Sequence, residues 1–117
     1  MSDGRVNDNL NLTRAIGDLE YKKNTNLKPE EQIISAFPDV EVRDLSTSDF
    51  FMIIGCDGIW ETMSTNDICE FVKKKIKEEK MELQKIVEIL LDELIAKETI
   101  EGIGCDNMSC ILIKFKH

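Results

Sequence analysis

Residues 50–58 read FFMIIGCDG, an uninterrupted apolar run that stops at an Asp-Gly pair. The run Phe50–Cys56 has the length of a strand, and apolar residues without polar alternation are typical of a strand that is buried on both faces. Asp57 follows directly, where the chain is expected to turn. We therefore predict a buried strand over Phe50–Cys56 with a carboxylate at its C-terminal end.

A second strand is predicted at Ser109–Phe115, close to the end of the sequence. Alternation places two sets of side chains on opposite faces: Ile111, Ile113 and Phe115 on one, Cys110 and Leu112 on the other. A loop that contains Gly102, Gly104 and Asp106 precedes this strand. If the two strands are neighbours in an antiparallel sheet, Asp57 and Asp106 would meet at one sheet edge.

Two amphipathic helices are predicted between the strands. Ser64 is a suitable N-cap with Asp67 three residues further on. Apolar residues follow at helical spacing at Ile68, Phe71, Val72 and Ile76. The second helix is expected from about Met81 to Lys97, because it carries a broad apolar stripe. The stripe consists of Leu83, Ile86, Val87, Leu90, Leu91, Leu94 and Ile95. Each stripe is expected to pack in the core rather than form a groove for a partner.

The N-terminal part of the sequence carries weaker patterns. Leu10 and Leu12 alternate with polar residues and predict a short strand before a turn at Gly17-Asp18. Residues 32–45 are expected to form two extended pieces around a Phe-Pro pair, followed by a turn at residues 46–49. Since the chain contains no internal repeat and no low-complexity linker, we expect one structural unit.

Composition excludes several classes of function. The chain has 117 residues, 15 Lys and Arg, and 23 Asp and Glu, so its net charge is −8, which argues against nucleic acid as the main partner. The basic run at residues 73–77 is interpreted as a solvated helix face. Four cysteines without a CxxC pair, and His117 as the single histidine, argue against zinc. No secretory leader or membrane span is predicted, so we expect free thiols in a cytoplasmic or nuclear compartment.

Asp57 and Asp106 are candidate metal ligands, because Mg²⁺ and Mn²⁺ prefer oxygen donors and usually bind one or more carboxylates together with water. Gly58 would permit close backbone approach, and Asn107 could orient its neighbour or a bound water. The alternative is that Asp-Gly and Asp-Asn are simply turn dipeptides. Two carboxylates are also too few for a metal site built by protein ligands alone.

Other conspicuous side chains are assigned structural roles. Trp60 and Met63 are expected to pack in the core. Arg14 could bind phosphate, but pairing with a carboxylate such as Asp18 is the favoured interpretation. The cysteines lack a histidine partner, so they are interpreted as structural thiols, and no side chain is predicted to be a catalytic nucleophile.

Three blocks of the sequence resemble the type-2C, metal-dependent serine/threonine protein phosphatases. They are GRVN at residues 4–7 with LNLTRAIGD at residues 10–18, FFMIIGCDGIWE at residues 50–61 with Met63-Ser64, and GCDNMS at residues 104–109 running into Ile111–Ile113. The resemblance implies an α+β fold, part of a four-layer α/β/β/α antiparallel β-sandwich. Residues 1–117 would form the C-terminal part of the catalytic domain.

The resemblance also implies a function and its site. The reaction would be hydrolysis of phosphoserine and phosphothreonine in phosphoprotein substrates, by a water that two Mg²⁺ or Mn²⁺ ions activate. Asp57 and Asp106 match metal ligands of the family, while Asn107, Gly58 and Asp18 would have supporting roles.

The family's N-terminal half, with an Asp-Gly-His-Gly motif and further acidic ligands, has no counterpart in these residues. We therefore expect the isolated chain to be inactive. The alternative is a noncatalytic module that binds partners or regulates a phosphatase on the same scaffold. Unpaired strand edges and apolar faces would favour self-association of the chain.

Overall fold

The computed structural model describes residues 5–7, 9–95 and 104–116. It divides into two compact units, Met1–Asp44 and Leu45–His117. The boundary lies in residues 36–46, which have no regular secondary structure. The composition of the sequence does not mark a linker there. In the structure the side chains of Val40 and Val42 are 75% and 93% exposed, so they add nothing to the core of either unit.

The N-terminal unit is held mainly by turns. It contains two short 3₁₀ helices, η1 (Leu19–Tyr21) and η2 (Pro29–Glu31). The strand predicted at Leu10 and Leu12 is wrong for the described residues: Leu10 closes a tight turn with Val6 through a 2.7 Å backbone hydrogen bond. The extended pieces predicted within residues 32–45 likewise form no paired strand, apart from an isolated parallel bridge between Arg14 and Ser35.

The C-terminal unit is built on a two-stranded antiparallel sheet. The strands β1 (Phe51–Gly55) and β2 (Cys110–Lys114) pair from Phe51 opposite Lys114 to Gly55 opposite Cys110. Both strands were predicted, β1 from its apolar run and β2 from alternation, and the structure shortens each by one residue at both ends. Their pairing places the C-terminal end of β1 beside the N-terminal end of β2.

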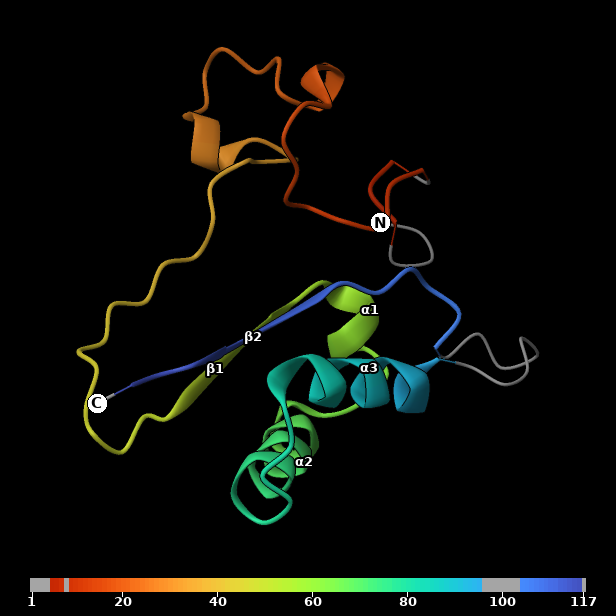
Figure 1. Cartoon of the computed structure of the whole chain (residues 1–117). Helices are drawn as coiled ribbons and strands as arrows, with labels where there is room; N and C mark the ends of the chain where they lie inside the picture. The colour runs from red at the N-terminus through yellow and green to blue at the C-terminus, as the bar shows by residue number, and fades with distance from the viewer. Residues whose placement is uncertain (1–4, 8, 96–103, 117) are drawn as a thin grey trace. The chain divides into compact units, whose positions relative to one another are not determined.

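Three helices cover one face of this sheet (Figure 1). They are α1 (Asp57–Trp60), α2 (Thr65–Lys77) and α3 (Leu83–Leu94). The buried core side chains of this unit all come from the helices, at Ile59, Ile68, Val72, Ile76, Ile86, Leu90 and Leu94. Trp60 and Met63 pack against this core, as predicted, and so do Cys110 and Leu112 of β2. The fold is a small α+β arrangement with one sheet layer and one helical layer.

The helix ends follow local chemistry. Ser64 caps α2 as predicted: its Oγ accepts a hydrogen bond from the Asp67 N–H at 3.2 Å and donates to the Asp67 carboxylate at 2.6 Å. The helix α3 is shorter than predicted, because Ile95 is already extended at ψ 131. The remainder of that prediction, residues 96 and 97, lies outside the described residues, as does part of the predicted glycine loop. No helix in the described ranges is long and apolar enough to cross a membrane.

The prediction that β1 is buried on both faces is wrong for the described structure. Phe51 and Ile53 pack on the helical core, whereas Met52 and Ile54 are 42% and 47% exposed. Ile111, directly opposite Ile54 on β2, is 59% exposed. An apolar run specifies two faces that avoid water, but the helices of this unit cover only one of them.

Candidate metal centre

Asp57 stands at the start of α1, immediately after β1. Cys56 is extended at φ −81 and ψ 177, and the chain turns into the one-turn helix at Asp57. The Asp57 Oδ1 accepts a 3.1 Å hydrogen bond from the N–H of Gly58, which restrains the carboxylate. The Asp57 side chain is exposed. Its second oxygen is therefore open to a ligand.

Asp106 has a similar local arrangement before β2. Its Oδ1 accepts a 2.7 Å hydrogen bond from the N–H of Asn107. In the loop before Asp106, Gly104 has a φ of 72°, a backbone conformation that favours glycine. Asp106 and Asn107 are both exposed. Each predicted ligand thus presents a carboxylate that the next backbone N–H restrains.

The segments that carry these two carboxylates are in direct backbone contact. The Cys56 N–H donates to the Ser109 carbonyl at 3.2 Å, and the Ser109 N–H donates to the Cys56 Sγ at 3.3 Å. A Cβ at Gly58 would lie only 2.6 Å from the carbonyl oxygen of Asn107. Glycine is required there because any side chain would clash with this carbonyl. The sequence alone suggested a close backbone approach at this position only as a general property of glycine. The structure therefore brings the two predicted segments together at one edge of the sheet.

Trp60 stabilises the turn that positions Asp57. Its indole N–H donates to the Gly55 carbonyl at 2.9 Å, while the Thr62 hydroxyl donates to the Gly58 carbonyl at 2.9 Å. Ile59, between them, is fully buried. Sequence reasoning assigned Trp60 to the core and missed this hydrogen bond. The signal was the indole N–H, a donor that needs a partner wherever tryptophan is buried.

Asp18 belongs to the N-terminal unit and has a local role in the structure. It adopts a left-handed backbone at φ 49 and its carbonyl accepts a hydrogen bond from the Tyr21 N–H at 3.0 Å. Arg14 pairs with a carboxylate, as predicted, but the partner is Asp39 at 3.4 Å and not Asp18. Both side chains of this pair are more than half exposed, and such pairs contribute little to stability.

The thiols close to the carboxylates are held in the sheet. Burial raises the pKa of the Cys110 thiol, and the neighbouring Cys56 raises it further. A raised pKa keeps a thiol protonated and less nucleophilic at neutral pH. This environment agrees with the interpretation of structural cysteines.

The donor set fits a hard cation in type but not in number. The exposed oxygens of Asp57 and Asp106 are ligands that Mg²⁺ and Mn²⁺ accept. Within residues 5–7, 9–95 and 104–116, however, no group of three His, Cys, Asp or Glu side chains is arranged to hold a metal ion. These residues can form part of a metal centre, and further oxygen ligands are needed to complete it.

Comparison with known proteins identifies the family. Residues 1–103 match the family model described as protein phosphatase 2C. The chain belongs to the protein phosphatase 2C family. Asp57 lies inside the matched range, and Asp106 follows it by three residues.

Individual relatives extend the likeness over almost the whole chain. "Probable protein phosphatase 2C 6" of Paramecium tetraurelia is 57% identical over 116 residues, which cover 99% of this chain and 39% of that protein. "Protein phosphatase 1G" of Bos taurus is 53% identical over 120 residues, covering 97% of this chain and 22% of that protein. The human protein of the same name is also 53% identical. The chain thus spans well under half the length of these relatives.

Proposed function

We propose that this chain contributes to a metal-dependent protein phosphatase that hydrolyses phosphoserine and phosphothreonine in proteins. The observation that carries the proposal is the contact between the Asp57 and Asp106 segments, each with a restrained and exposed carboxylate. Membership of the protein phosphatase 2C family supports the reaction class. Phosphoprotein substrates follow from the same membership.

Asp57 and Asp106 are the residues that would hold Mg²⁺ or Mn²⁺. Such ions, when bound, supply an activated water and screen the charge of the phosphoryl oxygens. Asn107 positions Asp106 through its backbone N–H, and Gly58 allows the two segments to approach. Asp18 supports the turn of the N-terminal unit.

The isolated chain is proposed to be inactive, because the described residues offer two carboxylates where a dedicated site needs more oxygen ligands. The proposed complete architecture is the four-layer antiparallel β-sandwich. The exposed apolar face of β1 and β2 supports it, since a second sheet would bury that face.

A chimera tests the function directly. Residues 1–117 would replace the matching segment of the bovine protein phosphatase 1G, and hydrolysis of a phosphothreonine peptide would be measured with Mn²⁺. We expect metal-dependent turnover, and a loss of at least about a thousandfold in the Asp57→Asn and Asp106→Asn chimeras. The matched control is Asp92→Asn, an exposed aspartate on α3. A folded chimera without turnover, or one that Asp57→Asn leaves unchanged, would contradict the assignment.

The inactivity of the isolated chain needs a separate measurement. Residues 1–117 alone would be assayed with the same peptide, and Mn²⁺ binding would be followed by electron paramagnetic resonance. We expect no turnover and weak binding that Asp57→Asn abolishes. Turnover comparable to that of the chimera would refute this part of the proposal.

A further inference from the structure

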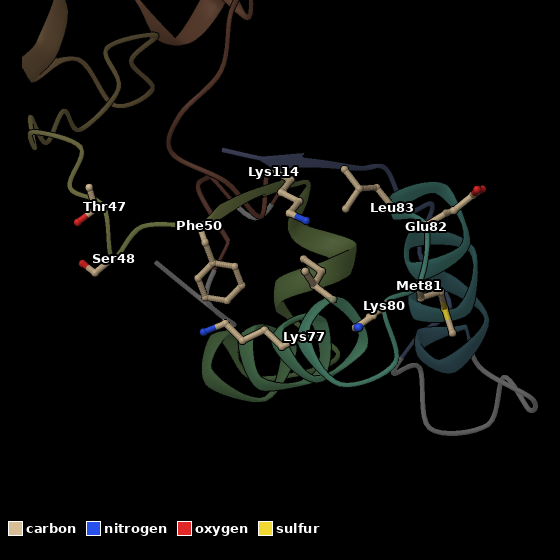
Figure 2. A pocket seen from close by; sticks show the side chains of 10 residues that line it. Thr47, Ser48, Phe50, Lys77, Lys80, Met81, Glu82, Leu83 and Lys114 are labelled. Carbon is tan, nitrogen blue, oxygen red and sulfur yellow. The ribbon is translucent and has the colours of Figure 1, made fainter. Parts of the chain in front are cut away.

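A groove of about 960 Å³ lies within the C-terminal unit, between one end of the sheet and the turn that joins α2 to α3. Four apolar side chains contribute to its walls: Phe50, Ile76, Met81 and Leu83. Figure 2 shows side chains from the sheet end and from the helical turn around a common opening. The walls can therefore accept an apolar side chain of a ligand.

Three lysines from different elements line the same groove. Lys77 ends α2, Lys80 lies in the turn before α3, and Lys114 ends β2. Among the described interactions, none of these three ammonium groups makes an ion pair or a hydrogen bond. Outside the groove, three helix lysines of the unit pair with glutamates, at Lys73–Glu70, Lys75–Glu79 and Lys85–Glu88, with N–O distances of 2.9, 3.0 and 3.1 Å. The groove thus concentrates unpaired positive charge in a chain whose net charge is −8.

The structure restrains the side chain of Lys77 and the backbone at Lys80. The Lys77 Nζ lies 4.2 Å from the centroid of the Phe50 ring, a cation–π contact that still leaves its N–H donors available. Lys80 adopts a left-handed backbone at φ 48, and the next residue, Met81, donates its N–H to the Lys75 carbonyl at 3.1 Å. A glycine would adopt this backbone at lower cost, but it would not bring a charge to the groove.

Acidic groups do not neutralise the groove from within. Glu82 is the one carboxylate among its described lining residues. In Figure 2 the Glu82 carboxylate points away from the ammonium groups of Lys77, Lys80 and Lys114. The charge that faces the opening is therefore positive.

The groove is separate from the candidate metal centre. Phe50 and Lys114 lie at one end of the paired strands, while Asp57 and Asp106 lie beyond the other end. The four residue steps from Phe51 to Gly55, at about 3.4 Å each, separate the two ends by about 14 Å. A ligand in the groove would leave the Asp57 edge open.

We propose that this groove binds an acidic segment of a protein, in which carboxylates flank an apolar side chain. The apolar side chain enters between Phe50, Met81 and Leu83, and the anionic groups contact the ammonium groups of Lys77, Lys80 and Lys114. An anionic membrane surface fits less well, because the lysines surround a concave opening. The inference goes beyond the proposed phosphatase function and does not depend on it.

Binding of a synthetic peptide to the full 117-residue chain tests the proposal. The probe is a nine-residue peptide of aspartates and glutamates with one central leucine, and the comparison peptide carries asparagine and glutamine instead. We expect calorimetric titration to give a Kd of about 10–100 μM for the acidic peptide and at least tenfold weaker binding for the neutral one.

Matched variants localise the binding. Lys80→Gln with Lys114→Gln should weaken the acidic peptide about fivefold to tenfold, since each exposed charge contact contributes modestly. Lys77 is left unchanged because its substitution would also remove the contact with Phe50. The control is Lys73→Gln with Lys85→Gln, which has the same net charge and should change binding less than twofold.

Three outcomes overturn the proposal. Equal binding of the acidic and neutral peptides removes the electrostatic argument. Equal weakening in both double variants indicates nonspecific attraction rather than the groove. Binding to phosphatidylserine vesicles without binding to the peptide assigns the surface to a membrane. Circular dichroism of each variant confirms that the fold is retained, so a loss of binding reports on the groove.

Discussion

Replacing Gly58 with alanine should separate the two segments that carry the candidate metal ligands. A Cβ at this position lies 2.6 Å from the Asn107 carbonyl oxygen and 3.4 Å from the Met108 Cγ. Gly58 is part of α1 and needs no left-handed backbone, so alanine suits its local conformation. The obstacle is therefore the opposing segment alone.

The expected change in unfolding free energy for Gly58→Ala is the difference between two opposing effects. Alanine in a helix is favoured over glycine by about 1 kcal/mol. Overpacking costs about 1–3 kcal/mol, and the upper half of that range applies because the obstacle is backbone rather than a side chain that can rotate. The net loss of unfolding free energy is then about 1–2 kcal/mol. For a unit of this size it corresponds to a decrease in Tm of about 5–15 °C.

Gly55→Ala is the matched control, three residues earlier at the end of β1. Its Cβ would lie 3.1 Å from the Ile59 Cγ1, 3.2 Å from the Ile59 Cβ and 3.3 Å from a ring carbon of Trp60, so these atoms need to move by only a few tenths of an ångström, less than the carbonyl opposite Gly58. We expect a smaller loss of unfolding free energy than for Gly58→Ala, about 1 kcal/mol or less. Urea denaturation followed by circular dichroism and by the fluorescence of Trp60, the single tryptophan, measures both variants. If Gly58→Ala proves as stable as Gly55→Ala, the inferred contact between the segments is wrong.

Three further perturbations have defined outcomes. Ser64→Ala removes the acceptor for the N–H of Asp67 and should destabilise the chain to urea by about 1 kcal/mol, whereas Ser64→Asp should largely retain the stability. The folded state raises the pKa of the Cys110 thiol, so this thiol loses its proton at lower pH in the unfolded state. The free energy of unfolding should therefore fall as pH rises above about 8.5. Cys110→Ala should flatten this pH dependence in urea titrations. Ile54→Lys places a charge on the exposed face of β1 and should reduce any concentration-dependent self-association in analytical ultracentrifugation. An unchanged sedimentation profile would show that this face is not the self-association surface.

Elements determined by local chemistry could be predicted from the sequence. The helix α2 follows from the Ser64 cap and the apolar spacing after it, both of which act within a few residues. The faces of β2 follow from alternation, and Leu112 packs on the core while Ile111 is exposed, as the pattern requires. These features need no knowledge of distant segments.

Features that depend on distant contacts could not be predicted. The uninterrupted apolar run of β1 indicates two buried faces, but burial of Met52 and Ile54 depends on what lies against the sheet. The alternation of Leu10 and Leu12 predicts a strand, yet a strand needs a partner, and Leu10 instead bonds to Val6. The single turn of α1 was too short for any periodic signal.

The candidate site divides in the same way. Asp57 and Asp106 could be selected from their positions next to predicted strands, but each is an ordinary turn residue when considered alone. Their common placement depends on the register of β1 and β2, and the requirement for Gly58 depends on a carbonyl 49 residues away in the sequence. From the sequence, Asp57 and Asp106 could be connected only by assuming that the two strands are antiparallel neighbours, or by the resemblance to a family.

The restraint of the two carboxylates bears on how a complete metal centre would gain affinity. In Asp57 and Asp106 one oxygen already accepts the next backbone N–H, so the side chain loses little further conformational freedom when its other oxygen binds a cation. Additional oxygen ligands would then add their attraction to two carboxylates that are each already restrained. Weak binding by this chain alone and strong binding by a complete site are therefore compatible with the same geometry at Asp57 and Asp106.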